Sequence, residues 1–213
     1  MVEPIAWWKM DGNLNDSSGN GYNGTNNGAP LTSDRFGNPN SAYSFNGTSS
    51  YASVSSPVPT AITNFSITAW IYPTSINQAS SGGGVGGTIL NADNDGATDG
   101  YDLGIRNNGT IWWWPAGGMD VFSTGTISLS VWTHIAVCAN GATFSLYING
   151  ALDSTTTTAQ TQVPTFLQIG SSSHITGYWQ GQLADIRIYP ATLLSTDIKE
   201  IYQQFNQASN FFA

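Results

Sequence analysis

The sequence predicts an all-β fold with one short helix close to its C-terminus, and three observations carry this prediction. Apolar and polar residues alternate along several segments, a period of two that is typical of strands. Clusters of Gly, Asn, Ser and Asp separate these segments, as turns require. Residues 195–205 carry the apolar spacing of a helix. A chain of 213 residues can form one such β domain.

The clearest predicted strand covers residues 65–72, where Phe, Ile, Ala and Ile occupy one face and Ser, Thr, Trp and Tyr the other. Two more strands, 132–138 and 143–148, are joined by Asn140-Gly141, the dipeptide most typical of a tight hairpin. A further strand is expected over 182–189, and shorter ones near 42–46, 50–54, 87–90, 101–106, 110–114, 120–123 and 166–169.

Turn-forming residues predict loops at 11–28, 77–87, 91–100 and 153–162. In the helix, Ser195 or Thr196 can act as the N-cap, and Ile198, Ile201, Tyr202 and Phe205 form its apolar stripe. No linker or repeat divides the sequence. We therefore expect one domain over 1–205, followed by a tail, 206–213.

Charge excludes two classes of partner. The formal net charge is −8, and the five cationic residues are far apart in the sequence: Lys9, Arg35, Arg106, Arg187 and Lys199. Nucleic acids and anionic membranes bind clustered cations, so neither is expected as a partner. No segment has the length of a membrane span, and the first residues do not form a signal peptide. The single cysteine, Cys138, lies in an apolar run and is expected to be buried.

Several blocks in a fixed order give the chain its family resemblance. They are residues 8–12 with 18–21, 43–47 with 51–54, 65–73, 132–137 leading to 146–150, and 167–170 followed by 181–189 and the helix. Together they resemble the laminin-G-like jelly-roll family of concanavalin A-like lectins and glucanases. The resemblance implies a jelly-roll sandwich of two antiparallel sheets.

Glucanases in that family use paired carboxylates, and a retaining mechanism needs them about 5 Å apart. This chain has two glutamates, Glu3 and Glu200, one near each end, and no predicted strand carries two inward-facing acids. Neither His134 nor His174 has a convincing Ser or Cys partner. The sequence therefore predicts no enzymatic activity.

The resemblance implies a structural calcium ion held by Asp185, Asp11 and the Asn46-Gly47 turn, because calcium takes six to eight oxygen ligands. Alternatively, Asp185 forms an ion pair with Arg187 or Lys9, or caps a turn. A weaker calcium candidate is the Asp-rich segment after Asn91, which contains Asp93 and Asp95 and leads to Asp102. The same residue types are also simply good turn formers.

Aromatic residues provide the candidate ligand contacts. Alternation places Trp112 and Trp114 on one face of their strand and Trp113 on the other, and exposed aromatic rings can stack on sugars. Trp70 and Tyr72 are expected to extend this surface into one concavity, with polar contacts from Tyr101, Asp102 and Arg106. Alternatively, the three tryptophans fill a wide core or a subunit contact.

Together these features predict a non-catalytic recognition module that binds carbohydrate or acts as an adhesin. The alternative is a phage virion surface protein, a head-decoration or tail-fibre component that uses the same fold for assembly. The expected partner is a glycan, or a cell-surface or capsid protein, and an oligomer is possible. The expected location is extracellular or on a virion surface.

Overall fold

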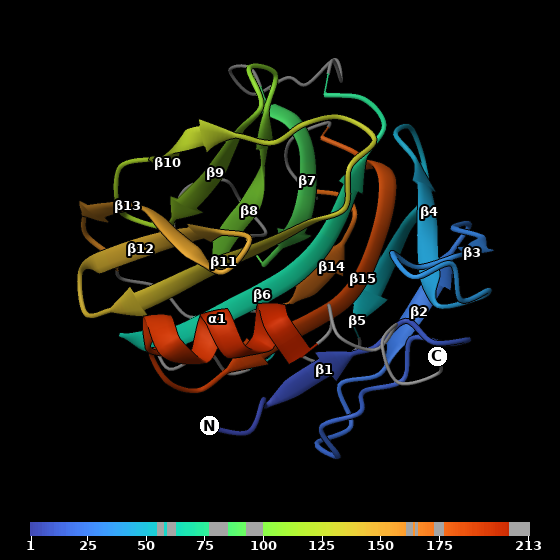
Figure 1. The fold of residues 1–213 in the computed structure, drawn as a ribbon, viewed down its shortest axis with the longest axis horizontal. Coiled ribbons are helices and arrows are strands. Elements are labelled where there is room, and N and C mark those ends of the chain that lie inside the picture. The colour runs from blue at the N-terminus through green and yellow to red at the C-terminus, as the bar shows by residue number, and fades with distance from the viewer. Residues whose placement is uncertain are drawn as a thin grey trace.

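The computed structural model describes residues 1–54, 58, 63–76, 85–92, 100–160, 164, 166–172 and 177–204. They form two antiparallel sheets packed face to face, with one helix, α1 (Ser195–Gln204), on the outside of one sheet (Figure 1). This confirms the predicted two-sheet sandwich with a short C-terminal helix. The part of the chain assigned to a tail, together with Phe205, lies outside the described residues.

Sheet A has the strand order β13-β12-β11-β6-β15-β4-β3, and β1 also pairs with β15. Its strands are β1 (Ala6–Trp8), β3 (Leu31–Thr32), β4 (Ala42–Asn46), β6 (Asn64–Pro73), β11 (Thr133–Asn140), β12 (Thr143–Ile148), β13 (Ala151–Thr157) and β15 (Gln180–Tyr189). The same edge of β15 pairs with β4 over residues 180–183 and with β1 over residues 186–188. Between these two pairings, Ala184 and Asp185 form an irregular stretch of β15.

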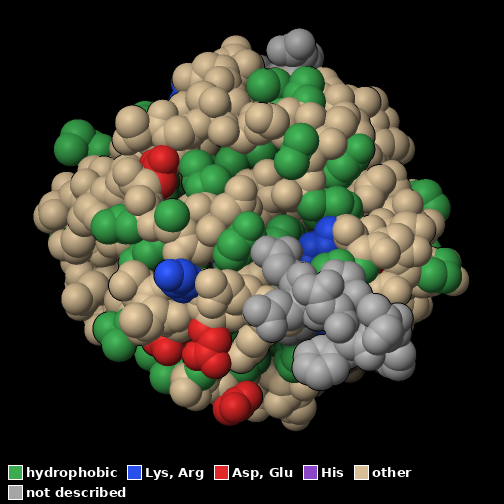
Figure 2. All heavy atoms as spheres, in the orientation of Figure 1, with side chains coloured by type: hydrophobic (Ala, Val, Ile, Leu, Met, Phe, Trp, Pro, Cys, Tyr) green, Lys and Arg blue, Asp and Glu red, His purple; other side chains and the backbone are tan. Residues whose placement is uncertain are grey.

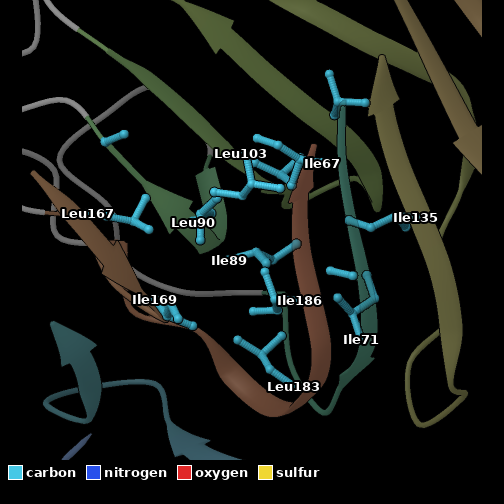
Figure 3. Packing of buried hydrophobic residues seen from close by; sticks show 14 of the residues in the cluster. Ile67, Ile71, Ile89, Leu90, Leu103, Ile135, Leu167, Ile169, Leu183 and Ile186 are labelled. Carbon is cyan, nitrogen blue, oxygen red and sulfur yellow. The ribbon is translucent and has the colours of Figure 1, made fainter. Parts of the chain in front are cut away.

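Sheet B has the order β10-β9-β8-β7-β14-β5-β2. Its strands are β2 (Gly24–Asn27), β5 (Tyr51–Val54), β7 (Val85–Asn91), β8 (Tyr101–Arg106), β9 (Thr110–Pro115), β10 (Val121–Thr126) and β14 (Leu167–Ile169). Apolar side chains from both sheets meet between them, as Figure 3 shows for Ile67, Ile71, Ile135, Leu183 and Ile186 of sheet A and Ile89, Leu90, Leu103, Leu167 and Ile169 of sheet B. The predicted inward face of 65–72 is confirmed, because Phe65, Ile67, Ala69 and Ile71 all belong to this core.

Four strands, β1, β2, β3 and β13, lie where the sequence predicts loops or no element. β13 covers the first half of the stretch expected to be a Thr- and Gln-rich connection, because β-branched threonines favour a pleated surface. β2 lies inside the expected loop 11–28, and its partly and fully exposed polar residues hide the alternation of a strand. The other two strands, β1 and β3, have only three and two residues, too few to show a period.

Along β15 the expected alternation is interrupted. Leu183 and Ile186 both face the core although they are three residues apart. The register of β15 against β6 shifts between Ala184 and Arg187, and Asp185 has a positive φ of 50°. This β-bulge re-aims the Asp185 side chain, as bulges commonly do.

α1 covers one half of the outer face of sheet A, the face turned away from sheet B (Figure 1). Ile198 and Ile201 of the helix pack on Cys138 and Tyr189, in a cluster that also contains Ala136, Tyr147 and Leu193. Cys138 is thus buried as expected, and burial raises its pKa to about 11, so the thiol stays protonated at neutral pH. None of the helices in the described part of the chain has the length and apolar character needed to cross a membrane.

Candidate ligand-binding site

The three consecutive tryptophans have three different environments. Trp113 is fully buried in the core, where its ring stacks on Tyr101 at 4.9 Å between centroids. Trp112 and Trp114 lie on the outer face of sheet B, Trp112 at 6% exposure and Trp114 half-buried. The predicted alternation is therefore confirmed. Tyr101, expected among the ligand contacts, instead points into the core and is 1% exposed.

Trp70 and Tyr72 do not share a surface with Trp112 and Trp114. Their strand, β6, belongs to sheet A, whereas β9 belongs to sheet B, and the core lies between the two sheets. Packed sheets are about 10 Å apart. The expectation that these residues line one concavity is therefore wrong, because the two pairs face away from each other across the sandwich.

On sheet B, the polar residues expected near the tryptophans already have protein partners. The amide of Asn91 donates a hydrogen bond of 2.6 Å to the Asp102 carboxylate, and both residues are fully buried. Arg106 lies 3.8 Å from Asp120 and over the ring of Phe122. Asp93 and Asp95, the other members of the weaker calcium candidate, lie outside the described residues.

The main calcium candidate does not come together as one site. Asn46 pairs with Gln180 at the start of β15, and Asp185 lies five residues further along, about 16 Å away at normal strand rise. The Asn46 side-chain oxygen accepts hydrogen bonds from the backbone of its own turn, at Thr48, Ser49 and Ser50. These residues therefore do not fit a shared metal ion. In the part of the chain that the structure describes, no three His, Cys, Asp or Glu side chains group to hold one.

Asp185 instead binds two protein side chains, which agrees with the ion-pair alternative. Its carboxylate accepts hydrogen bonds from Arg187 Nε at 2.8 Å and Arg187 Nη2 at 3.0 Å. It also accepts one from the Trp7 indole N–H at 2.7 Å. Burial lowers the pKa of Arg187, but the charge and hydrogen bonds of Asp185 outweigh burial and raise it. Arg187 therefore remains charged.

Next to this ion pair lies a pocket, here called the charged pocket, with a volume of about 350 Å³. It is lined by Trp7, Lys9, Asp11, Asp34, Arg35, Phe36, Asn38, Ser41, Ala184 and Asp185. The lining comes from β1 and the residues after it, from the 34–41 segment before β4, and from the bulge of β15. Sites for small ligands have volumes of about 300–1,000 Å³ and combine rings with a few polar groups.

Three of the five cationic side chains converge at this pocket. Lys9 Nζ and the Arg187 guanidinium lie over the Trp7 ring, 4.4 and 4.3 Å from its centroid. The Arg35 guanidinium lies 4.2 Å from the Trp70 centroid and 4.5 Å from that of Phe36. Cation–π contacts of this kind are attractive and hold both partners in place. The sequence analysis missed this cluster because its members are separated by up to 178 residues.

Beyond Arg35, the outer face of sheet A carries a row of half-buried side chains. The Tyr72 and Trp132 rings are 5.5 Å apart, and the register places Gln182 beside Tyr72 and Ser44 beside Gln182. We call these four residues the aromatic platform. Figure 2 shows apolar side chains gathered on this face above α1, across β6 and β11. On β15, Gln182 of the platform and Ala184 of the charged pocket are two residues apart and lie on the same face of the strand, so the two parts of the surface adjoin.

Trp70 connects the two parts of the surface to α1. The centroid of its ring lies 5.8 Å from that of Tyr202 in the helix and 5.3 Å from that of His134 in β11. His134 is buried, and neither of its ring nitrogens has a hydrogen-bond partner. Burial lowers its pKa to about 3, so the ring is neutral at physiological pH.

The fold is that of a jelly-roll sandwich. The chain belongs to the concanavalin A-like lectin/glucanases superfamily, since the Laminin_G_3 family model matches residues 46–199. The recognised resemblance is thereby confirmed. The matched range begins at Asn46, the last residue of β4, so Trp7, Lys9 and Arg35 of the charged pocket lie before it. No curated protein matches the sequence.

Several solved structures share the fold. Domain 4 of AbnA, an extracellular GH43 arabinanase from Geobacillus stearothermophilus solved with arabinotriose, is 18% identical. The alignment covers 95% of this chain and 99% of that domain, with a TM-score of 0.71. The binding domain of Paraclostridial Mosquitocidal Protein 1 is 15% identical over 96% of this chain, with a TM-score of 0.73. The binding domain of botulinum neurotoxin serotype D is 18% identical over 95%, with a TM-score of 0.71. This chain spans about half the length of the two toxin domains, 52% and 51%.

Proposed function

We propose that this protein is a non-catalytic carbohydrate-binding module whose ligand lies on the outer face of sheet A. The observation that carries the proposal is the junction of the charged pocket with the aromatic platform. A sugar ring has apolar C–H faces and a rim of hydroxyl groups. The half-buried Trp–Tyr pair can stack on the C–H faces, and the polar side chains of the pocket can bind the hydroxyl groups.

The carboxylates of the pocket support binding rather than hydrolysis. Asp185 is held by Arg187 and Trp7, and Asp34 accepts hydrogen bonds from the backbone N–H groups of Phe36 and Asn38. Glycoside hydrolysis needs one carboxyl group to protonate the leaving oxygen and a second to act as nucleophile or base. Carboxylates that are already bound to protein donors serve neither role well. The third carboxylate of the pocket, Asp11, is exposed but cannot fill both roles alone, so we expect no hydrolysis at this site.

The structural neighbours suggest suitable ligands for a first test. The AbnA domain was solved with arabinotriose, and the toxin domains are binding domains. A neutral oligosaccharide is therefore a reasonable first probe for this chain. The assembly role on a virion, the alternative drawn from the sequence, remains a prediction without a specific structural feature in its favour.

The test compares two half-buried tryptophans on opposite faces of the sandwich, Trp132 and Trp114. Oligosaccharide affinity is measured by calorimetry for the wild type, Trp132→Ala and Trp114→Ala. Removal of a stacked indole costs a few kcal/mol at roughly 25 cal/mol per Å². We expect Trp132→Ala to weaken binding about tenfold to hundredfold and Trp114→Ala to leave it within about twofold. If only Trp114→Ala weakens binding, the ligand lies on sheet B and the proposed site is wrong.

A further inference from the structure

We infer that the charged pocket selects neutral glycans and disfavours those that carry carboxylate or sulfate groups. The inference rests on the proposed function and adds the charge class of the ligand. It starts from the balance of charge at the pocket. Three cationic side chains, Lys9, Arg35 and Arg187, meet three carboxylates there, those of Asp11, Asp34 and Asp185.

This balance differs from the rest of the molecule. The whole chain carries five cationic and thirteen acidic residues, so its net charge is −8. Three of the five cations lie at the pocket, and the remaining two, Arg106 and Lys199, are on β8 and α1. An approaching polyanion therefore meets overall repulsion and finds no net positive charge at the pocket to offset it.

The cationic side chains of the pocket already interact with carboxylates or aromatic rings of the protein. Arg187 binds Asp185 through two N–H groups, and Lys9 lies on the Trp7 ring. Arg35 is held between Trp70 and Phe36, close enough to Asp185 and Asp34 for their charges to act on its pKa. A carboxylate on the ligand would have to compete with carboxylates of the protein for these donors. It would also lie near Asp11, whose side chain is exposed beside Ser41.

Neutral hydroxyl groups meet no such conflict. A hydroxyl can donate to Asp11 and accept from Lys9 or Asn38, so both kinds of polar group in the lining find a partner. Binding through neutral hydrogen bonds changes little with ionic strength, whereas binding of an anion changes as salt is added, because salt screens both its attraction to the cations and its repulsion from the negative charge of the protein. The charge class of the ligand is therefore measurable in two independent ways.

The first experiment screens wild-type protein against tri- to hexasaccharides of arabinose, xylose and glucose and against those of galacturonic and glucuronic acid. We expect the neutral sugars to bind more tightly than the acidic ones, and the affinity for the neutral sugars to stay within about twofold between 20 and 300 mM salt. Binding of the acidic sugars as tight as, or tighter than, the neutral ones would overturn the charge inference and leave the proposed function standing. If no sugar binds, the proposed function fails as well.

A charge variant supplies the second readout. Asp11→Asn leaves the pocket with one net positive charge, and Asp120→Asn makes the same change beside Arg106, outside the pocket. We expect Asp11→Asn to raise affinity for the acidic oligosaccharides about fivefold at low salt, and Asp120→Asn to change it by less than about twofold. Equal effects of the two variants would show that only total charge matters, which contradicts selection by the pocket.

Discussion

At the scale of single residues, Asp185 shows how a strained backbone position places a functional side chain. It has a positive φ of 50° inside a strand, a conformation that costs free energy for a residue with a Cβ. Three hydrogen bonds to its carboxylate, two from Arg187 and one from Trp7, offset this conformational free energy. The result fixes the Trp7 ring, which forms one wall of the charged pocket.

Asp185→Asn should destabilise the protein without any involvement of calcium. The substitution leaves the Arg187 charge buried without its carboxylate partner, and breaking a buried ion pair costs about 3–5 kcal/mol. Urea denaturation should give the same loss of unfolding free energy in calcium and in chelator.

The double variant Asp185→Asn, Arg187→Met serves as its control and should recover part of that loss, because no buried charge remains. If the loss from Asp185→Asn appears only in calcium, Asp185 is a metal ligand after all.

Residue positions that follow from local alternation could be predicted, and those that depend on a bulge or on distant contacts could not. Alternation alone separates Trp113 from Trp112 and Trp114. The same alternation puts Tyr101 on the apolar face of β8 with Leu103 and Ile105, so the expectation of a ligand contact at Tyr101 went against the local pattern. The convergence of Lys9 and Arg187 follows from the pairing of β1 with β15, which no local pattern encodes.

At the scale of elements, α1 is docked through a neutral histidine. His134 lies under Trp70 and Tyr202, at 5.3 and 6.1 Å between ring centroids, with no hydrogen-bond partner for either nitrogen. The charged groups that act on it are Asp185, Arg187 and Arg35, and the two arginines oppose its protonation. Protonation would therefore place an unsolvated charge between the helix and sheet A.

This arrangement predicts a loss of stability in mild acid. The pKa of His134 is about 3 in the folded protein and about 6.5 when unfolded, so the unfolded state binds more protons between these values. Stability is then highest above pH 6.5 and falls as the pH is lowered toward 3. At pH 5 the unfolding free energy should be about 2 kcal/mol below its value at pH 7.5.

Denaturation curves of the wild type and His134→Phe at both pH values measure this effect, and the variant should lose most of the difference. His174→Gln controls for the second histidine, which lies outside the described residues. An equal acid response in the wild type and His134→Phe would assign the effect to other groups. Asp16, whose pKa is lowered mainly by its hydrogen bonds against the effect of burial, titrates at a lower pH and does not interfere.

The elements themselves were predictable where the period of two was long. β6, β11, β12 and β15 coincide with predicted strands to within about two residues at each end. The prediction failed for β1, β2, β3 and β13, which are short or polar at the edges of their sheets. The position of such strands is determined by backbone pairing with a neighbour rather than by a buried face.

At the scale of the whole molecule, the two outer faces of the sandwich differ in kind. On sheet B, Trp112, Asn91 and Asp102 are buried although they point away from the core. On sheet A, α1 covers one half, and the charged pocket and the aromatic platform occupy the other. The family and the two-sheet architecture could be predicted from the ordered sequence blocks. Which outer face carries the candidate ligand site could not be predicted, because aromatic side chains able to stack on a sugar occur on both sheets. Only the packing of the two sheets distinguishes the faces.

The most direct test of the central claim is an NMR titration that follows the indole N–H signals of the eight tryptophans with a bound oligosaccharide. Each signal reports one position on the molecule. Trp132 of the platform and Trp7 of the charged pocket should shift with the same affinity, while Trp114 on sheet B and Trp113 in the core should not. Shifts at Trp114 or Trp112, with Trp132 and Trp7 unchanged, would place the ligand on sheet B and contradict the account.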